Sequence, residues 1–295
     1  MPAIRSGMPG LAPGGRVAEW SATSIGLVAL DVDGTLVRES QVPEQRILDA
    51  VRDLASLGVK VGLSTGRMSA SSLEILNTGV LTGPHVFNNG AVITDGDGEE
   101  LHVLGLTDDE VDAVLDMGRG HDDVWVEIYL NSEYLTDRVD PRSGEHVDLL
   151  GVAPTGLVAR AADLEGRPVV KAVMVCLTPE ATTRTLGAVD ELGLVAGPAG
   201  SPATPDLRFV NITRAGVDKG TGVEAAARAA GLRLAEVVSI GDETNDIPAL
   251  SRAGTAIAMG DADAEVRAHA HFVAPPFHES GAAVALESLR ALLEA

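Results

Sequence analysis

Residues 27–36 read Leu-Val-Ala-Leu-Asp-Val-Asp-Gly-Thr-Leu, so four apolar residues run directly into two acids that are one residue apart. The apolar run predicts a strand buried on both faces, as in a parallel sheet. Gly34 ends the strand, because a tight turn favours a residue that accepts a positive φ. Open α/β sheets bind ligands at the carboxyl ends of their strands, where Asp31 and Asp33 lie. Burying two acids is costly without a cation, so we expect a metal ion and an anionic substrate.

The same pattern of a buried strand followed by a polar loop recurs after a predicted helix. The strand 59–63 runs into residues 64–67, Ser-Thr-Gly-Arg, and a further short strand, 84–87, ends in Asn-Asn-Gly-Ala. Right-handed crossover connections make successive strands parallel and bring their carboxyl ends to one edge. We therefore expect Thr65 and Arg67 to lie beside the two acids.

The pattern of predicted strands and helices changes near residue 95. A turn cluster at 95–98 precedes short strand-like runs and helical patterns, and the runs 128–130 and 133–135 indicate an antiparallel hairpin. A stretch rich in Pro and Gly at 196–205 is predicted to be a loop. These features predict a separate inserted α/β domain over residues 95–207.

The earlier alternation of buried strands, polar loops and helices then resumes, with a strand predicted at 207–212. Lys219 stands at the entry of an Ala-rich helix, and the buried strand 237–240 runs into Gly-Asp-Glu-Thr-Asn-Asp at 241–246. We predict an α/β fold whose core, residues 25–94 and 208–295, is a Rossmann-like parallel sheet split by the insertion. Residues 1–24 are predicted to be a poorly ordered extension.

Composition limits the classes of partner. Asp and Glu number 43 against 22 Lys and Arg, which gives a net charge of −21. Such an acidic surface argues against nucleic acids and anionic membranes as partners. The one cysteine, Cys176, lies in an apolar run, which predicts a buried thiol and suits a reducing cytoplasm. The sequence leaves the oligomeric state open.

The polar strand ends carry the chemistry of metal and phosphate binding. Oxygen ligands without His or Cys suit Mg²⁺, and a lysine ammonium suits phosphate oxygens. One carboxylate can attack phosphorus while a second protonates the leaving group and later activates water. Several residues also have structural readings: Thr65 as a helix N-cap, Asn89 as a turn former and Arg67 as half of a surface ion pair.

Four motifs resemble those of the haloacid dehalogenase superfamily: Asp31-Val32-Asp33-Gly34-Thr35, Ser64-Thr65-Gly66-Arg67, Lys219 and Gly241-Asp242-Glu243-Thr244-Asn245-Asp246. More narrowly, the chain resembles the Cof-type phosphatases, which carry a large α/β cap between the second and third motifs. The match runs in order from about Ile25 to the C-terminus. Asp261 is a departure, because the family commonly has Asn there.

The resemblance implies a role for each matching residue. It implies Asp31 as the nucleophile and Asp33 as the general acid and base. It implies phosphate binding by Thr65 and Lys219. We also predict phosphate binding by Gly66 and Arg67, and a place for Asn89 in the substrate site. It also implies Mg²⁺ bound by the Asp31 carboxylate, the Asp33 backbone carbonyl and Asp242, with Asn245 and Asp246 in support.

We therefore predict a cytoplasmic, Mg²⁺-dependent phosphatase that hydrolyses small phosphate monoesters, such as sugar phosphates, through an aspartyl phosphate. Phosphomutase-like transfer to a second hydroxyl is one alternative, and a non-catalytic protein that binds a phosphometabolite is another. In the insertion, Glu127, Tyr129 and Lys171 could face the substrate, whereas Trp125 reads more readily as core.

Overall fold

The computed structural model describes residues 7–21, 24–38, 41–201 and 204–295. They form two compact units, which we call the core and the cap. The core lies within Met1–Arg67, Ser72–His102 and Asp218–Ala295, and the cap within Met68–Ser71 and Val103–Val217. The predicted α/β class, with a parallel sheet and an inserted cap, is confirmed.

The core is built on a six-stranded sheet with the strand order β1-β14-β13-β12-β2-β3. Every neighbouring pair is parallel except β1 and β14. The acidic motifs therefore follow adjacent parallel strands, β2 and β12. The strands are β1 (Ala12–Pro13), β2 (Leu27–Leu30), β3 (Lys60–Leu63), β12 (Val237–Gly241), β13 (Thr255–Ala258) and β14 (Phe272–Val273).

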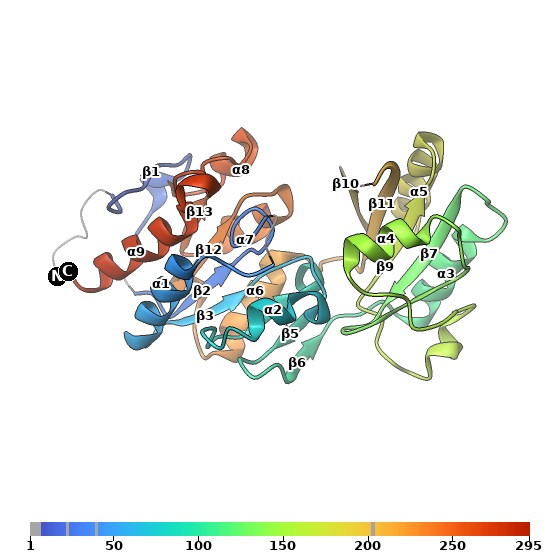
Figure 1. Ribbon diagram of the computed structural model, residues 1–295, viewed down its shortest axis with the longest axis horizontal. Helices are drawn as coiled ribbons and strands as arrows, with labels where there is room; N and C mark the ends of the chain where they lie inside the picture. The colour runs from blue at the N-terminus through green and yellow to red at the C-terminus, as the bar shows by residue number, and fades with distance from the viewer. Residues whose placement is uncertain (1–6, 22–23, 39–40, 202–203) are drawn as a thin grey trace. The chain divides into compact units, whose positions relative to one another are not determined.

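Helices from both ends of the chain cover the core sheet. Helices α1 and α9 lie side by side although they come from opposite ends of the sequence (Figure 1), and Arg46 pairs with Glu287 between them at 2.7 Å. On the face of β2 that carries Leu27 and Ala29, apolar residues of α6 and α7 complete the core. The core helices are α1 (Gln45–Ser56), α2 (Leu73–Leu76), α6 (Lys219–Ala229), α7 (Ile247–Arg252), α8 (Ala264–Ala268) and α9 (Gly281–Leu293).

Short 3₁₀ helices η1 to η7 occupy several connections. They are Val17–Glu19, Ser69–Ser72, Asn88–Gly90, Ala161–Leu164, Leu234–Glu236, Thr244–Asp246 and Phe277–Glu279. Among the described residues, no helix combines the length and apolar character needed to cross a membrane.

The start of the insertion differs from the prediction. Strands β4 (His85–Phe87), β5 (Val92–Thr94) and β6 (Glu100–Val103) form a three-stranded sheet, in which β4 and β5 are antiparallel. The cap therefore begins near Val103 rather than at residue 95. The turn cluster at 95–98 closes a hairpin of the core, because a turn-forming sequence does not say which strand its exit will join.

The N-terminal segment also departs from the prediction of a poorly ordered extension. Strand β1 pairs with β14, and the Trp20 indole donates to Thr255 Oγ1 at 2.9 Å and meets the Phe272 ring edge to face at 4.8 Å. Arg16 donates to the backbone carbonyl of Leu250 at 3.1 Å. These long-range contacts order the segment, although its Gly and Pro content had predicted poor order. Residues 1–6 and 22–23 of the predicted extension lie outside the described residues.

The cap is a five-stranded antiparallel sheet with the strand order β10-β11-β9-β7-β8. Helices α3 and α5 cover one face, where apolar side chains of β7, β9 and β11 form the cap's hydrophobic core. Helix α4 places His146 against Phe209, which is not part of that core, at a ring distance of 4.5 Å. The elements are α3 (Asp108–Gly118), β7 (Val124–Tyr129), β8 (Tyr134–Thr136), α4 (Ser143–Leu150), β9 (Lys171–Cys176), α5 (Pro179–Glu191), β10 (Val195–Ser201) and β11 (Thr204–Thr213).

The end of the cap corrects two further predictions. Residues 207–212 belong to β11 and pair with β9, so they are a cap strand and not the first strand of the returning core. The predicted loop 196–205 largely forms β10 and the start of β11. An apolar run fits a central antiparallel strand as well as a parallel one, and Pro198 is tolerated because β10 is an edge strand.

Candidate active site

Three carboxylates and one ammonium group meet at the carboxyl edge of the core sheet, and we call them the acid cluster. Asp31 follows β2, Asp242 follows β12 and Asp246 closes η6, and oxygens of the three lie within 4.8 Å of one another. Lys219, the first residue of α6, places Nζ 2.6 Å from Asp31 Oδ1 and 2.7 Å from Asp246 Oδ1. Lys219 is only 1% exposed and Asp31 only 3%, so these charges interact away from bulk water.

The local sequence makes this close approach possible. Gly34 has a φ of +82°, and a Cβ there would lie 2.0 Å from Asp242 Oδ2. Thr35 donates from Oγ1 to Asp242 Oδ1 at 2.7 Å. Asp246 Oδ2 accepts the backbone N–H groups of Asp242 and Glu243, both at 3.0 Å. The glycine and the hydroxyl thus fix Asp242, while two backbone donors fix Asp246.

The acid cluster carries more negative than positive charge. Burial, followed by the nearby Asp246 charge, raises the pKa of Asp31 well above its usual value. Burial also raises the pKa of Asp242, to about 7. Burial alone would lower the pKa of Lys219, but the charges of Asp246 and Asp31 outweigh burial and raise it. One ammonium therefore does not offset three carboxylates, and this surplus of hard oxygen donors fits a divalent cation such as Mg²⁺.

A second group of predicted residues surrounds the loop after β3. The Arg67 guanidinium holds the Asp33 carboxylate in a two-pronged ion pair, with Nη2 2.6 Å from Oδ1 and Nε 2.9 Å from Oδ2. Arg67 Nη1 also donates to Gln41 Oε1 at 2.8 Å. Arg67 thus forms an ion pair, as one of its two sequence-based interpretations predicted, and its partner is the candidate general acid, Asp33.

Thr65 and Asn89 are tied to this loop by local hydrogen bonds. Thr65 is fully buried, and its Oγ1 accepts the Arg67 N–H at 3.1 Å. The Asn89 N–H donates to the Thr65 carbonyl at 3.0 Å, and Asn89 Oδ1 accepts from Asn245 Nδ2 at 3.1 Å. A Cβ on Gly66 would lie 3.1 Å from Asn89 Oδ1. Asn245 therefore braces Asn89 through its Nδ2, and its support of the metal stays a prediction.

Some residues around the site had no role in the sequence-based prediction. Thr35 and Gln41 hold Asp242 and Arg67, and Thr35 could have been suspected because it directly follows the acidic motif. Asp261, the departure from the family, forms an ion pair with Arg38, whose guanidinium lies 4.9 Å from the centre of the Phe277 ring. The added negative charge at Asp261 is therefore balanced within the chain.

The cap buries a carboxylate of its own in what we call the Glu127 cluster: Trp125, Glu127, Tyr129 and His146. Glu127 Oε1 accepts from the Trp125 indole at 3.0 Å and lies 2.8 Å from His146 Nδ1, while Oε2 accepts the Tyr129 hydroxyl at 2.8 Å. Lys171 Nζ lies 4.6 Å from the centre of the Tyr129 ring, and burial lowers the Lys171 pKa to about 8. The sequence allowed Trp125, Glu127, Tyr129 and Lys171 either a core role or a substrate-binding role. The structure buries all four of them together in the cap.

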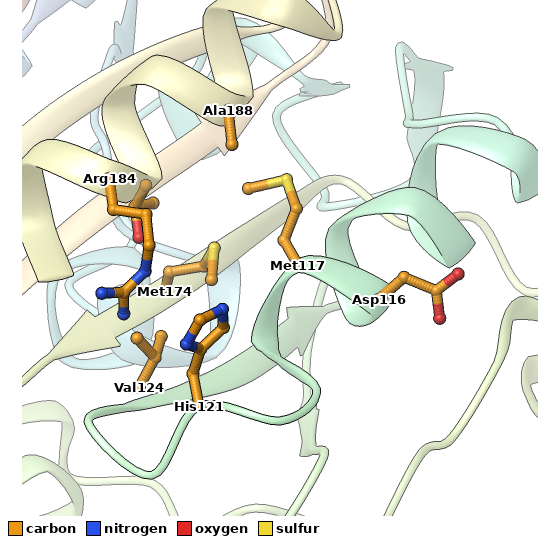
Figure 2. A pocket seen from close by; sticks show the side chains of 8 residues that line it. Asp116, Met117, His121, Val124, Met174, Arg184 and Ala188 are labelled. Carbon is orange, nitrogen blue, oxygen red and sulfur yellow. The ribbon is translucent and has the colours of Figure 1, made fainter.

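The cap also contains a cavity of about 200 Å³ between α3 and α5. Figure 2 shows Met117 of α3 and Arg184 of α5 at this cavity, with Met174 between them and His121 below. Arg184 is already paired with Asp123 at 2.7 Å. None of the residues predicted to act on a phosphate lines the cavity.

A parallel α/β core with acids at its carboxyl edge and an inserted cap defines the class of fold. The chain belongs to the haloacid dehalogenase-like hydrolase family, whose sequence profile matches residues 28–286. The predicted membership of this superfamily, and with it the prediction of a hydrolase, is confirmed.

Individual relatives agree with this assignment. An HMP-PP phosphatase from Yersinia pestis is 28% identical over 240 residues, which are 80% of this chain and 84% of the relative. A solved structure from Bacteroides thetaiotaomicron, described among phosphatases of the superfamily, is 26% identical, with a TM-score of 0.75 over 91% of this chain and 96% of that one. A hypothetical protein from Geobacillus kaustophilus shares the fold with a TM-score of 0.77 at 23% identity, covering 90% of this chain and 99% of that one.

Proposed function

We propose that this protein is a Mg²⁺-dependent phosphatase that hydrolyses small phosphate monoesters through an aspartyl phosphate on Asp31. One observation carries the proposal: Lys219 Nζ lies 2.6 Å from Asp31 Oδ1 inside a buried cluster with two more carboxylates. A nucleophilic carboxylate next to a phosphate-binding cation is the arrangement that phosphoryl transfer needs. The phosphatase relatives support the same class of reaction.

The steps follow from the roles of the residues. An Asp31 carboxylate oxygen attacks phosphorus, the bond from phosphorus to the leaving oxygen breaks, and Asp33 gives a proton to that oxygen, which departs as the alcohol. Asp33 then takes a proton from water, whose oxygen attacks phosphorus and frees Asp31 and inorganic phosphate. Lys219 and Thr65 hold phosphoryl oxygens throughout. Asp31, Asp242 and the Asp33 carbonyl would hold Mg²⁺, with Asn245 and Asp246 in support, and the ion would neutralise phosphoryl charge.

The Arg67 ion pair adds a condition to this sequence of steps. Both carboxylate oxygens of Asp33 are held by Arg67 in this structure. Proton transfer to a leaving group therefore requires at least one of these contacts to be exchanged. A bound phosphate ester offers Arg67 a competing anionic partner, so we infer that substrate binding frees Asp33.

We propose a sugar phosphate or a similar small ester as the substrate, and the cytoplasm as the compartment. The name of the Yersinia pestis relative points to a substrate called HMP-PP, which belongs in the same assay panel. The net charge of −21 disfavours nucleic acids and anionic membranes as partners.

A direct assay tests the proposal. Purified protein should release inorganic phosphate from at least one member of a panel of phosphorylated sugars, polyols and cofactors, should stop in EDTA and should recover with Mg²⁺. Asp31→Asn should lower turnover by about 10⁴-fold or more without lowering the melting temperature, because an amide cannot attack phosphorus. Asp49 is an exposed acid on α1, so Asp49→Asn is the matched control and should match wild type.

Three outcomes would contradict the proposal. Turnover that persists in metal-stripped protein would remove Mg²⁺ from the mechanism. An isomerised sugar phosphate in place of free phosphate would favour a mutase. Tight binding of phosphate esters without turnover of any of them would favour a binding protein.

A further inference from the structure

The cavity between α3 and α5 of the cap has no part in the proposed phosphatase mechanism. It measures about 200 Å³, and Val124 of β7 and Met174 of β9 line it from the helix-covered face of the cap sheet. Successive side chains of a strand point to opposite faces of its sheet, so Glu127 of β7 points to the other face. The cavity is therefore separate from the Glu127 cluster and needs an explanation of its own.

The two helices that flank the cavity are packed closely on the sheet. A Cβ on Gly118, the last residue of α3, would lie 2.4 Å from Val126 Cγ2, so this end of α3 contacts β7 directly. Ala181 and Val189, on either side of the part of α5 that lines the cavity, are both fully buried. Protein interiors contain few voids larger than a water molecule. A cavity of this size between two well-packed helices is thus preformed, as ligand sites usually are.

The apolar part of the lining suits a small aromatic ring. In Figure 2 the Met117 and Ala188 side chains point into the space between the helices, and Met174 lies between Met117 and Arg184. Methionine thioethers make favourable contacts with the edges of aromatic rings. An apolar cavity of about 150 Å³ holds benzene, so the cavity of about 200 Å³ accommodates a ring with one further substituent.

The polar part of the lining suits a carboxylate on that ring. The Arg184 and His121 side chains point toward one another at the cavity, whereas Asp116 points away from it (Figure 2). Arg184 uses Nη2 in its pair with Asp123, and a guanidinium has five N–H donors, so donors remain for a ligand carboxylate. The Arg184 side chain is 39% exposed, so a ligand can enter from solvent on this side. Thr185 adds a buried hydroxyl to the lining.

We propose that the cap binds a small aromatic carboxylate in this cavity, with the ring between Met117 and Met174 and the carboxylate on Arg184. The ring supplies the apolar surface that is buried on binding, and the charge-assisted hydrogen bonds to the guanidinium fix its orientation. This site goes beyond the proposed phosphatase function, because no residue assigned to phosphate or metal binding takes part in it.

The test uses phenylacetate as the probe and the full chain with isotopically labelled methionine methyl groups. The methyl resonances of Met117 and Met174 should shift as phenylacetate is added, whereas those of Met68 and Met259, which are buried in the core, should not. We expect a Kd of about 1 mM, which is ordinary for a ligand of this size. The absence of any shift at about ten times that concentration would overturn the proposal.

Two variants separate the roles of charge and space. Arg184→Met should weaken phenylacetate binding about tenfold or more, because the charge-assisted hydrogen bonds are lost. Arg160→Met removes an exposed arginine elsewhere in the cap and should leave the Kd unchanged. Ala188→Leu should abolish binding by filling the cavity while Arg184 stays in place, and a melting temperature at or above that of wild type would show that this variant folds. Wild-type affinity in Arg184→Met or in folded Ala188→Leu would overturn the site.

Competition experiments distinguish this site from the acid cluster. Saturating inorganic phosphate with Mg²⁺ should leave the shifts of Met117 and Met174 unchanged, whether or not the protein proves to be a phosphatase. Displacement of phenylacetate by phosphate would place the probe at the acid cluster and overturn the proposal. Benzyl alcohol, which has the ring without the charge, should bind about tenfold more weakly. Equal affinity for the alcohol would overturn the assignment of a carboxylate ligand.

Discussion

The core and the cap each bury carboxylates, but the two units neutralise them in different ways. In the Glu127 cluster one carboxylate faces an indole, a phenol and an imidazole, all within 3.0 Å. In the acid cluster three carboxylates share the single ammonium of Lys219, and the pKa values of Asp31 and Asp242 are raised. The cap network is satisfied by neighbours, whereas the core cluster holds a surplus of negative charge. Buried acids alone therefore do not indicate a catalytic site, and the unbalanced set is the one that we propose to be catalytic.

Removing the ammonium should have the largest effect on this comparison. Lys219→Met leaves three buried carboxylates without their cation and removes a phosphate ligand. We expect turnover to fall by about 10³-fold and the free energy of unfolding to fall by about 3 kcal/mol in metal-free protein. Phosphate release and urea unfolding measure the two effects. Lys60→Met, an exposed lysine on β3, is the control, and a variant at position 219 that kept full turnover would remove Lys219 from the site.

Disrupting the cap carboxylate should affect folding and spare the chemistry. Glu127→Ala leaves the Trp125 indole and the Tyr129 hydroxyl buried without their acceptor, so we expect the free energy of unfolding to fall by about 2–4 kcal/mol. Glu127→Gln keeps one acceptor and should lose less. Turnover of p-nitrophenyl phosphate by the folded fraction should stay near wild type. If Glu127→Gln abolished turnover in fully folded protein, the contrast between a structural and a catalytic cluster would fail.

The last prediction concerns a dependence of stability on pH. The folded-state pKa of Asp242, about 7, lies above its ordinary value of about 3.9, so the folded protein binds more protons than the unfolded chain. Stability of the metal-free protein should therefore fall as pH rises from about 4 to about 7, by at most about 1.4 kcal/mol per pH unit, and then level off. Saturating Mg²⁺ should flatten this slope because a cation favours the ionised carboxylate. Thermal melts of wild type and Asp242→Asn measure the difference, and identical slopes would reject the assignment.

Much of the candidate site follows from the sequence by one rule. Parallel strands end at one edge, so the acids after β2 and β12 had to lie close together, and the chemistry of those residue types suggested a cation and a phosphate. The same rule explains what was missed. It places the ends of strands and says nothing about side-chain direction, so neither the choice of Asp33 as the partner of Arg67 nor the burial of the Asn88 amide could be predicted from the motifs.

The sequence also does not show which strands pair with each other. The apolar run in β11 predicts a buried strand equally well in either unit, and only its register with β9 places it in the cap. Strand β10 contains Pro and Gly, which predict a loop unless the strand lies at an edge, where one face of the backbone needs no partner. Strand identity was therefore easier to predict at the centre of the core sheet, where consecutive apolar residues allow few other readings.

The two-residue strand β1 has a consequence for handling the protein. It occupies the outermost position of the core sheet, and Gly14 and Arg16 extend its contacts by donating to the carbonyls of His271 and Ala270. Pro13 has no N–H, so the rim it forms is a poor template for another chain. In a chain shortened to begin at Ser24, Phe272 and Val273 would instead form an unpaired edge strand, which we expect to promote self-association. Purification tags are therefore better attached at the C-terminus, with the first twenty or so residues left in place.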